Sequence, residues 1–237
     1  VARLELGHRL LHPLRHGGML ARSAACGRRL EEGRDLVEQR AHCLVIGVGE
    51  GFGMGCVRKF ASQGYTVSML ARKADRLAQF ESEVAQAKGY AADIEDLESF
   101  RAVLAQSVEE HGLPEVVIYN AARATFGSYD TVPLEQFERN FRTNATGLLA
   151  VAQDLLPGMA ERGHGSLMVT GNTAATRGKP LFVGWAPTKA AQRILAEALA
   201  REVGPKGVHV AYFVVDAAID MPFARARFGK QPKDFYA

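Results

Sequence analysis

Glycines recur at every second position in one short stretch of the chain. The stretch, V-I-G-V-G-E-G-F-G-M-G, runs from Val45 to Gly55 and begins within an apolar run, 43–46, that is typical of a buried strand. A strand that leads through glycines into a helix lets the backbone approach a ligand closely, while the helix N–H groups and dipole attract phosphate. We predict that Gly47, Gly51 and Gly53 hold a pyrophosphate. A flexible turn without a ligand is the alternative, because short glycine motifs also occur by chance.

The elements that would position this turn alternate between strand and helix. The predicted strands are 43–46, 65–70, 90–92, 115–119, 166–170 and 208–215. The predicted helices are 54–63, 75–88, 97–111, one long or bent helix over 134–162, and 185–203. Apolar strands that alternate with helices indicate a parallel sheet covered on both faces, with ligands at the carboxyl ends of the strands. We therefore predict a single α/β domain of the Rossmann type, doubly wound.

Composition excludes several other classes of protein. The 237 residues suffice for one α/β domain and are too few for two. Cys26, Cys43 and Cys56 match neither a disulfide framework nor a metal-binding spacing, which predicts a reducing compartment and no metal site. No apolar run approaches the ~18 residues that span a bilayer, so we expect a soluble protein without a membrane partner. Outside residues 1–30 the charges nearly balance, which argues against nucleic-acid binding.

Residues 1–40 lack the strand and turn pattern of residues 41–237, so we predict an N-terminal extension before the nucleotide-binding domain. Residues 1–30 hold six arginines and three histidines against the single acid Glu5, a composition that resembles a mitochondrial transit segment. The first residue is Val1, which favours a fragment or a read-through of upstream sequence. An added arm with a short helix over 30–40 is a third interpretation. We expect a cytoplasmic protein, or a mitochondrial one if the extension is a transit segment.

From Ala41 to Ala226 the chain resembles the short-chain dehydrogenase/reductase family. The family's T-G-x-x-x-G-x-G turn matches 46–53 except for its threonine, and its N-N-A-G element is similar to 119–122. Its Asp-Val pair and its helix asparagine are similar to Asp93-Ile94 and Asn144, and 204–210 is typical of the approach to the sixth strand. The cofactor-binding residues that the resemblance implies are Gly47, Gly51, Phe52, Gly53, Arg72, Asp93, Ile94, Asn120, Ala121, Lys189 and Ile219.

At the catalytic positions the chain departs from the family pattern. The family uses a Ser at the end of the fifth strand and a Tyr-x-x-x-Lys on the next helix. The lysine here is Lys189, so Trp185 stands at the tyrosine position, and Asn172 stands at the serine position thirteen residues earlier. With Asn144, these residues form the catalytic set that the resemblance implies, and neither hydroxyl is present.

Loss of the tyrosine hydroxyl matters because hydride transfer to a carbonyl leaves an alkoxide that must be protonated. In the family the tyrosine supplies this proton, with its pKa lowered by the lysine. The Trp185 indole keeps its proton at neutral pH, whereas Asn172 can still polarise a carbonyl. Without a general acid, rates fall by about 100-fold to 10,000-fold, so we expect residual reduction.

Candidate substitutes for the missing hydroxyls are Thr173, Tyr129, Tyr212 and Tyr236, each with a capping, packing or surface role as its alternative. Phe182 stands where the enoyl reductases of the family carry a tyrosine, so that variant is excluded.

Three further family roles follow from the resemblance. Lys189 would bind the nicotinamide ribose from the same helix face as Trp185, with a solvated lysine as the alternative. Asn144 would hold a helix bend and a water, with a surface asparagine as the alternative. Ile219 would contact the nicotinamide carboxamide through its backbone, although Asp216-Ala217 replaces the usual Pro-Gly before it.

The choice of dinucleotide depends on opposing charges. Where NAD enzymes of the family carry an Asp, this chain has Ala71, followed by Arg72 and Lys73, which suit a 2′-phosphate. Glu50 would repel that phosphate. Two positive charges against one negative favour NADP over NAD.

The family's seventh strand has no counterpart before Ala237, which would leave the sixth strand at a sheet edge. Helices 134–162 and 185–203, which pair across a dimer in relatives, predict a homo-oligomer. The predicted function is hydride transfer between NAD(P) and a small carbonyl or alcohol. A catalytically inactive NAD(P)-binding sensor or partner subunit is the alternative, and a fragment that does not fold alone is a third interpretation.

Overall fold

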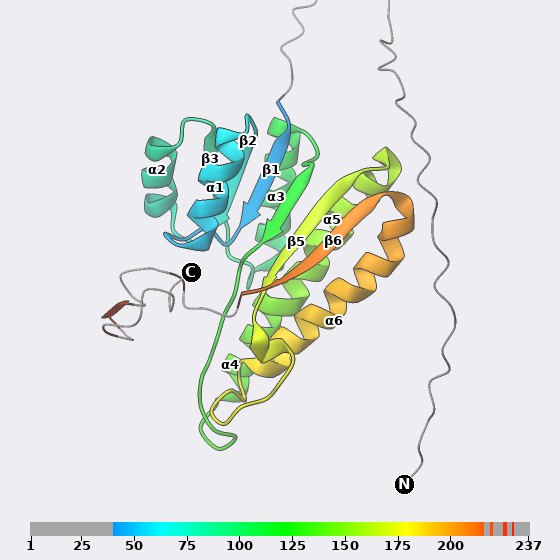
Figure 1. Cartoon of the computed structure of the whole chain (residues 1–237). Coiled ribbons are helices and arrows are strands. Elements are labelled where there is room, and N and C mark those ends of the chain that lie inside the picture. Colours follow the sequence, from blue (N-terminus) through cyan, green and yellow to red (C-terminus); the bar gives the residue numbers. More distant parts are fainter. Residues whose placement is uncertain (1–39, 216–218, 220–224, 227–228, 230–237) are drawn as a thin grey trace, which may run out of the picture. The chain divides into compact units, whose positions relative to one another are not determined.

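The computed structural model describes residues 40–215, 219, 225–226 and 229 (Figure 1). Its centre is one parallel sheet with the strand order β3-β2-β1-β4-β5-β6. The strands are β1 (His42–Ile46), β2 (Thr66–Ala71), β3 (Ala87–Ala91), β4 (Val116–Tyr119), β5 (Gly165–Gly171) and β6 (Val208–Val214). Among the described residues, β3 and β6 lie at the two edges. The strand order reverses between β1 and β4, which is where doubly wound sheets bind ligands.

The helices connect these strands on both faces of the sheet. They are α1 (Phe52–Ser62), α2 (Ala74–Glu83), α3 (Leu97–His111), α4 (Leu134–Phe141), α5 (Gly147–Arg162) and α6 (Ala186–Val203). A π-helix, η1 (Arg142–Thr146), joins α4 to α5, and short 3₁₀ turns occupy η2 (Thr173–Ala175) and η3 (Gly204–Lys206). Within the described part of the chain, no helix combines the length and apolar character needed to cross a membrane.

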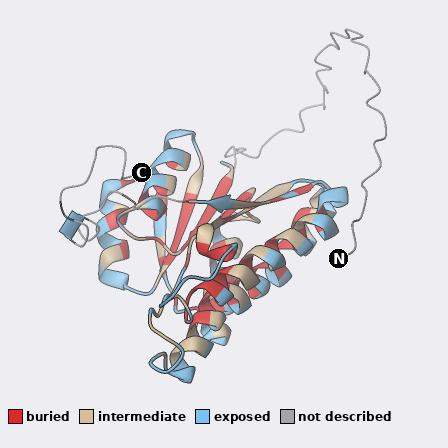
Figure 2. Ribbon diagram, turned by 60° about the horizontal axis from the view of Figure 1, so that its bottom comes forward, coloured by how far each residue is buried: buried red, intermediate tan, exposed pale blue. Residues whose placement is uncertain are grey.

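Side chains that alternate along β1 enter two separate cores. Leu44 and Ile46 pack with α3, α5 and α6, whereas Cys43 and Val45 pack with α1 and α2. This alternation follows from the two-residue period of a strand, and Figure 2 shows the central strands buried between the helical layers. Both faces are covered, which explains the nearly continuous apolar strands. The predicted doubly wound α/β fold is confirmed.

One predicted boundary, between the second helix and the third strand, was wrong. The helix predicted over 75–88 ends at Glu83, and residues 87–91 form β3, which pairs with β2. Sheet pairing overrides the helical pattern here, and Gly89 packs so closely that a Cβ on it would lie 2.7 Å from Leu77 Cβ. The long or bent helix predicted over 134–162 has the observed outer bounds, and it contains the π-helical turn η1, which accommodates Asn144.

Candidate nucleotide-binding and catalytic site

The glycine-rich turn places backbone where side chains do not fit. Gly47 has φ +90°, and a Cβ on it would lie 2.4 Å from the backbone nitrogen of Ala121. A Cβ on Gly53 would lie 3.0 Å from the Gly47 carbonyl oxygen. Gly51 caps α1, whose first turn carries no acidic residue, so its N–H groups present a positive end. Glycine at 47 and 53 therefore lets the turn pack against neighbouring backbone, and the start of α1 supplies the dipole that attracts a pyrophosphate.

Asn120 joins the turn to the neighbouring strands. Its backbone N–H donates to the Ile46 carbonyl at 2.8 Å, and its Nδ2 donates to the Gly47 carbonyl at 2.8 Å. Its Oδ1 accepts from the Thr170 hydroxyl at 2.9 Å. One side chain thus connects the carboxyl ends of β1, β4 and β5, which fixes the shape of the turn.

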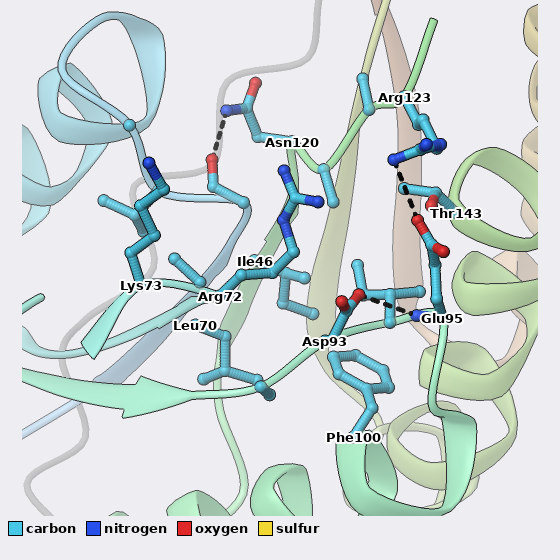
Figure 3. A pocket seen from close by; sticks show the side chains of 18 of the residues that line it. Ile46, Leu70, Arg72, Lys73, Asp93, Glu95, Phe100, Asn120, Arg123 and Thr143 are labelled. Carbon is cyan, nitrogen blue, oxygen red and sulfur yellow. Dashed lines mark hydrogen bonds and ion pairs between the residues drawn. The ribbon is translucent and has the colours of Figure 1, made fainter. Parts of the chain in front are cut away.

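A cavity of about 300 Å³ opens beside this turn (Figure 3). Of the predicted cofactor-binding residues, six line it: Gly47, Arg72, Asp93, Ile94, Asn120 and Ala121. The lining does not include Gly51, Phe52 and Gly53, which lie at the start of α1, or Lys189 and Ile219. Six residues from four separate chain segments therefore meet at one cavity.

Charged side chains face this cavity from two sides. Arg72 and Lys73 lie on one side, and the ion pair between Arg123 and Glu95 lies on the other (Figure 3). Glu95 accepts from Arg123 Nη1 at 3.1 Å and from Arg139 Nε at 2.6 Å, which neutralises its carboxylate. Arg76, which the sequence reasoning missed, also lines the cavity and lies 3.9 Å from Glu50. The cavity lining near Arg72 therefore carries three basic side chains, one more than the two, Arg72 and Lys73, that were expected from the sequence.

Asn144 is buried in η1 and connects the loop after β4 to α6. Its Oδ1 accepts from the Arg123 backbone N–H at 2.9 Å, and its Nδ2 donates to the Arg123 carbonyl at 2.8 Å. The same Nδ2 donates to the Thr188 hydroxyl at 2.7 Å, and that hydroxyl donates to the Trp185 carbonyl at 2.8 Å. Asn144 therefore helps to set where α6 begins.

Lys189 is almost completely buried behind Trp185. Its Nζ donates to the Thr170 carbonyl at 2.9 Å and to Gln192 Oε1, and it lies 5.3 Å from the centre of the Trp185 ring. Burial lowers the pKa of Lys189 to about 7, since a charged amine is disfavoured away from water. An amine with this pKa can exchange a proton near neutral pH.

Of the remaining catalytic candidates, Tyr212 lies close to both Lys189 and Asn172. Asn172 caps η2, with its Oδ1 accepting from the Ala174 N–H at 3.0 Å. The Tyr212 hydroxyl donates weakly to the Lys189 carbonyl at 3.5 Å, and burial raises the pKa of Tyr212 to about 12. Tyr129 is 88% exposed, and Thr173 begins η2. Tyr236, Asp216 and Ala217 lie outside the described residues.

A sequence profile of the family described as short chain dehydrogenase matches residues 41–224. The chain belongs to the short-chain dehydrogenase family. Oxidoreductase asL5 of Sarocladium schorii is 27% identical over 199 residues, which are 82% of this chain and 78% of that protein. A short-chain dehydrogenase from Streptomyces avermitilis has a TM-score of 0.73 at 27% identity, over 78% of this chain and 68% of that chain. The structure of ElxO with NADP bound has a TM-score of 0.74 at 19% identity, over 82% and 81%, and shows a shared fold.

Membership of the short-chain dehydrogenase family confirms the resemblance and supports NAD(P)-dependent oxidoreductase chemistry. The sequence reasoning missed Arg76, Arg123, Glu95 and Gln192. Arg76 follows Arg72 by four residues and was detectable as a third basic residue of that segment. No local pattern marks the other three, because their contacts form only in the folded chain.

Proposed function

We propose that this short-chain dehydrogenase is an NAD(P)-dependent oxidoreductase that interconverts a carbonyl and an alcohol on a small molecule. The observation that carries the proposal is the cradle formed by the glycine turn and the start of α1, beside a cavity that Gly47, Arg72 and Asp93 line. Such a cradle suits a pyrophosphate, and the adjoining cavity at Asp93 and Ile94 suits the adenosine half. When bound, the dinucleotide supplies or accepts the hydride.

Charge near the second strand supports NADP over NAD. Arg72, Lys73 and Arg76 all line the cavity, and a guanidinium binds a phosphate through charge-assisted hydrogen bonds. Glu50 opposed this assignment, but its carboxylate lies 3.9 Å from Arg76 Nη2, so part of its repulsion is offset. Arg72, Lys73 and Arg76 together carry three positive charges against the single negative charge of Glu50.

We assign proton transfer to Lys189. Trp185 has no ionisable hydroxyl, whereas the Lys189 ammonium lies 5.3 Å from its ring with a pKa of about 7. In carbonyl reduction the Lys189 ammonium would give one proton to the alkoxide that hydride transfer leaves. In alcohol oxidation the neutral amine would take that proton back. Asn172 would polarise the carbonyl as a neutral donor. Lys189→Ala should abolish turnover, and unchanged turnover in that variant would remove Lys189 from the site.

A titration with NADPH, and separately with NADH, tests the cofactor assignment. Trp185 is the only tryptophan of the chain and stands beside Lys189, so bound nicotinamide should quench its fluorescence. Arg72→Ala should weaken NADPH binding by about tenfold or more and leave NADH nearly unchanged. Arg58→Ala is the matched control, because Arg58 pairs with Glu83 and does not line the cavity. A folded protein that responds to neither nucleotide would contradict the assignment.

The second candidate function is NAD(P) binding without chemistry, as a sensor or a partner subunit. Asn172 and Trp185 favour it, because neither catalytic hydroxyl of the family is present. If only the hydroxyls are missing, Asn172→Ser combined with Trp185→Tyr should raise turnover by about 100-fold to 10,000-fold. Saturable NADPH binding with no turnover in the parent, and turnover in the double variant, would establish this second function.

A further inference from the structure

Gln192 lies one turn after Lys189 in α6 and is completely buried. Its Oε1 accepts a hydrogen bond from the Lys189 ammonium. The carbonyl of Thr170 on β5 accepts a second bond at 2.9 Å, and the Trp185 ring lies 5.3 Å from the same nitrogen. The position of the ammonium is therefore defined by α6 on one side and β5 on the other.

The other half of the Gln192 side chain has no partner among the described residues. Its Nε2 is buried without a hydrogen-bond acceptor. An ammonium has donors only, so the amide oxygen must face Lys189, and the NH₂ group must face away. A buried, unpaired amide donor lowers stability, whereas leucine or methionine at this position would not carry that penalty. Packing alone therefore does not explain an amide here, while the contact with Lys189 does.

We propose that Gln192 is a positioning residue, whose carbonyl holds the Lys189 ammonium beside Trp185 and keeps that buried amine charged. The inference rests on the proposed function, in which Lys189 serves the dinucleotide and the proton transfer. Burial alone pushes the amine toward its neutral form, and a hydrogen bond to the charged form opposes this. Gln192 thereby raises the pKa of Lys189 relative to the same buried site without an acceptor.

Few other groups can set the charge of Lys189. Among the described residues, no carboxylate forms an ion pair with it. From β6, Tyr212 reaches its backbone carbonyl, and with a pKa of about 12 this phenol stays neutral near pH 7. Arg193, the next cation along α6, is paired with Glu197. From η1, Asn144 reaches α6 only through Thr188, and neither side chain titrates.

The test is a pH titration of Trp185 fluorescence in the full chain without nucleotide. The ammonium 5.3 Å from the only indole should change its emission on losing a proton. We expect a midpoint near pH 7 in the parent. Gln192→Leu should move the midpoint down by about one pH unit or more, and Gln192→Glu, with a carboxylate in the same place, should move it up by about one unit or more.

Two controls keep the result interpretable. Lys189→Met should remove the transition, and Ser107→Ala, which deletes a buried hydroxyl on α3, should leave the midpoint unchanged. If the transition survives in Lys189→Met, the Lys189 midpoint is read from its ¹³Cε resonance, assigned with that same variant. Gln192→Met replaces Gln192→Leu if the latter does not fold cooperatively.

Opposite shifts in the two Gln192 variants support the proposal, because a merely structural role would not move the midpoint in both directions. Midpoints that stay at the parent value, or that move the same way, overturn it. Since no nucleotide is present, this result is independent of whether NADPH binds. Failure of the proposed function is recognised separately, by the absence of a response in the NADPH titration.

Discussion

Gly47 is the residue at which the binding site depends most directly on the absence of a side chain. Its φ of +90° is unfavourable for any other residue, and a Cβ would lie within 2.4 Å of Ala121. Gly47→Ala should destabilise the fold by on the order of 2 kcal/mol and weaken NADPH binding, since the turn must move. Gly49→Ala, in the same turn, has open space for its Cβ and should change stability by less than about 0.5 kcal/mol. Thermal unfolding measures the stability of both variants, and equal losses of stability would contradict a special requirement for glycine at position 47.

The buried amine of Lys189 makes stability depend on pH. Its pKa is about 7 in the fold, against an ordinary value of 10.5. Below about pH 7, Lys189 is charged in both the folded and the unfolded chain, so folding carries the full free-energy cost of burying the charge. Between the two values the unfolded chain binds more protons, so the free energy of unfolding should rise with pH by up to about 1.4 kcal/mol per unit. In the Lys189→Met variant the free energy of unfolding should not show this rise with pH. Denaturant unfolding of both proteins between about pH 7 and 10 measures it, and parallel pH curves would contradict the burial argument.

Spacing along the sequence predicts some of the site residues but not their partners. Lys189 follows Trp185 by one helical turn, so their common location was predictable and the ring contact agrees with it. Gln192 also lies within one turn, but its role depends on Thr170, which α6 meets only after the sheet forms. Binding of the nicotinamide ribose by Lys189 stays a prediction, and in this structure its Nζ donates to the Thr170 carbonyl and to Gln192.

At the scale of elements, the junction of η1 and α5 depends on close packing across the sheet. A Cβ on Gly147 would lie 2.3 Å from Ile94 Cγ2 and 2.5 Å from the Tyr119 hydroxyl, which donates to the Thr143 carbonyl in η1. Gly147→Ala should therefore destabilise the protein by on the order of 1–3 kcal/mol, although alanine favours helices.

Gly55→Ala in α1 is the matched helical control for Gly147→Ala. Its Cβ would meet nothing within 4 Å, so it should stabilise the protein by about 0.5–1 kcal/mol. Chemical denaturation gives both values. Stabilisation by Gly147→Ala would show that the junction is looser than described.

Element types were predictable because hydrophobic periodicity is local, as at α3, whose predicted and observed bounds coincide. The π-turn at η1 was not, because it exists to admit the buried Asn144 hydrogen bonds to the loop after β4. The end of α2 was not predicted because pairing with a distant strand overrides the local helical preference there. Residues 84–88 are helix-compatible in isolation, and their pairing with β2 makes them a turn and a strand.

At the scale of the whole molecule, the alternation of strands and helices was sufficient to predict the doubly wound sheet, since a parallel sheet needs a crossover after each strand. It was not sufficient to define residues 1–40. The division into an extension and a domain at that boundary stays a prediction, because residues 1–39 lie outside the described part of the chain.

We propose that the chain forms a homo-oligomer through the helices of 134–162 and 185–203. Leu149 on α5 is 40% exposed and Ile194 on α6 is 53% exposed, although the opposite sides of both helices enter the core. Large apolar side chains on two helices favour association with a second copy. Leu149→Arg combined with Ile194→Arg should convert an oligomer into a monomer with unchanged secondary structure, because a charge buried in such a contact is left unpaired.

Sedimentation velocity measures this conversion, and Tyr129→Ser is its control, because Tyr129 is an exposed aromatic residue that belongs to neither α5 nor α6. The control should sediment like the parent. A parent that is monomeric at micromolar concentration, or a double variant that stays oligomeric, would place association elsewhere or exclude it. If the variant is monomeric and still binds NADPH as the parent does, the cradle at Gly47 is complete within one chain, as its contacts with Asn120 and Ala121 require.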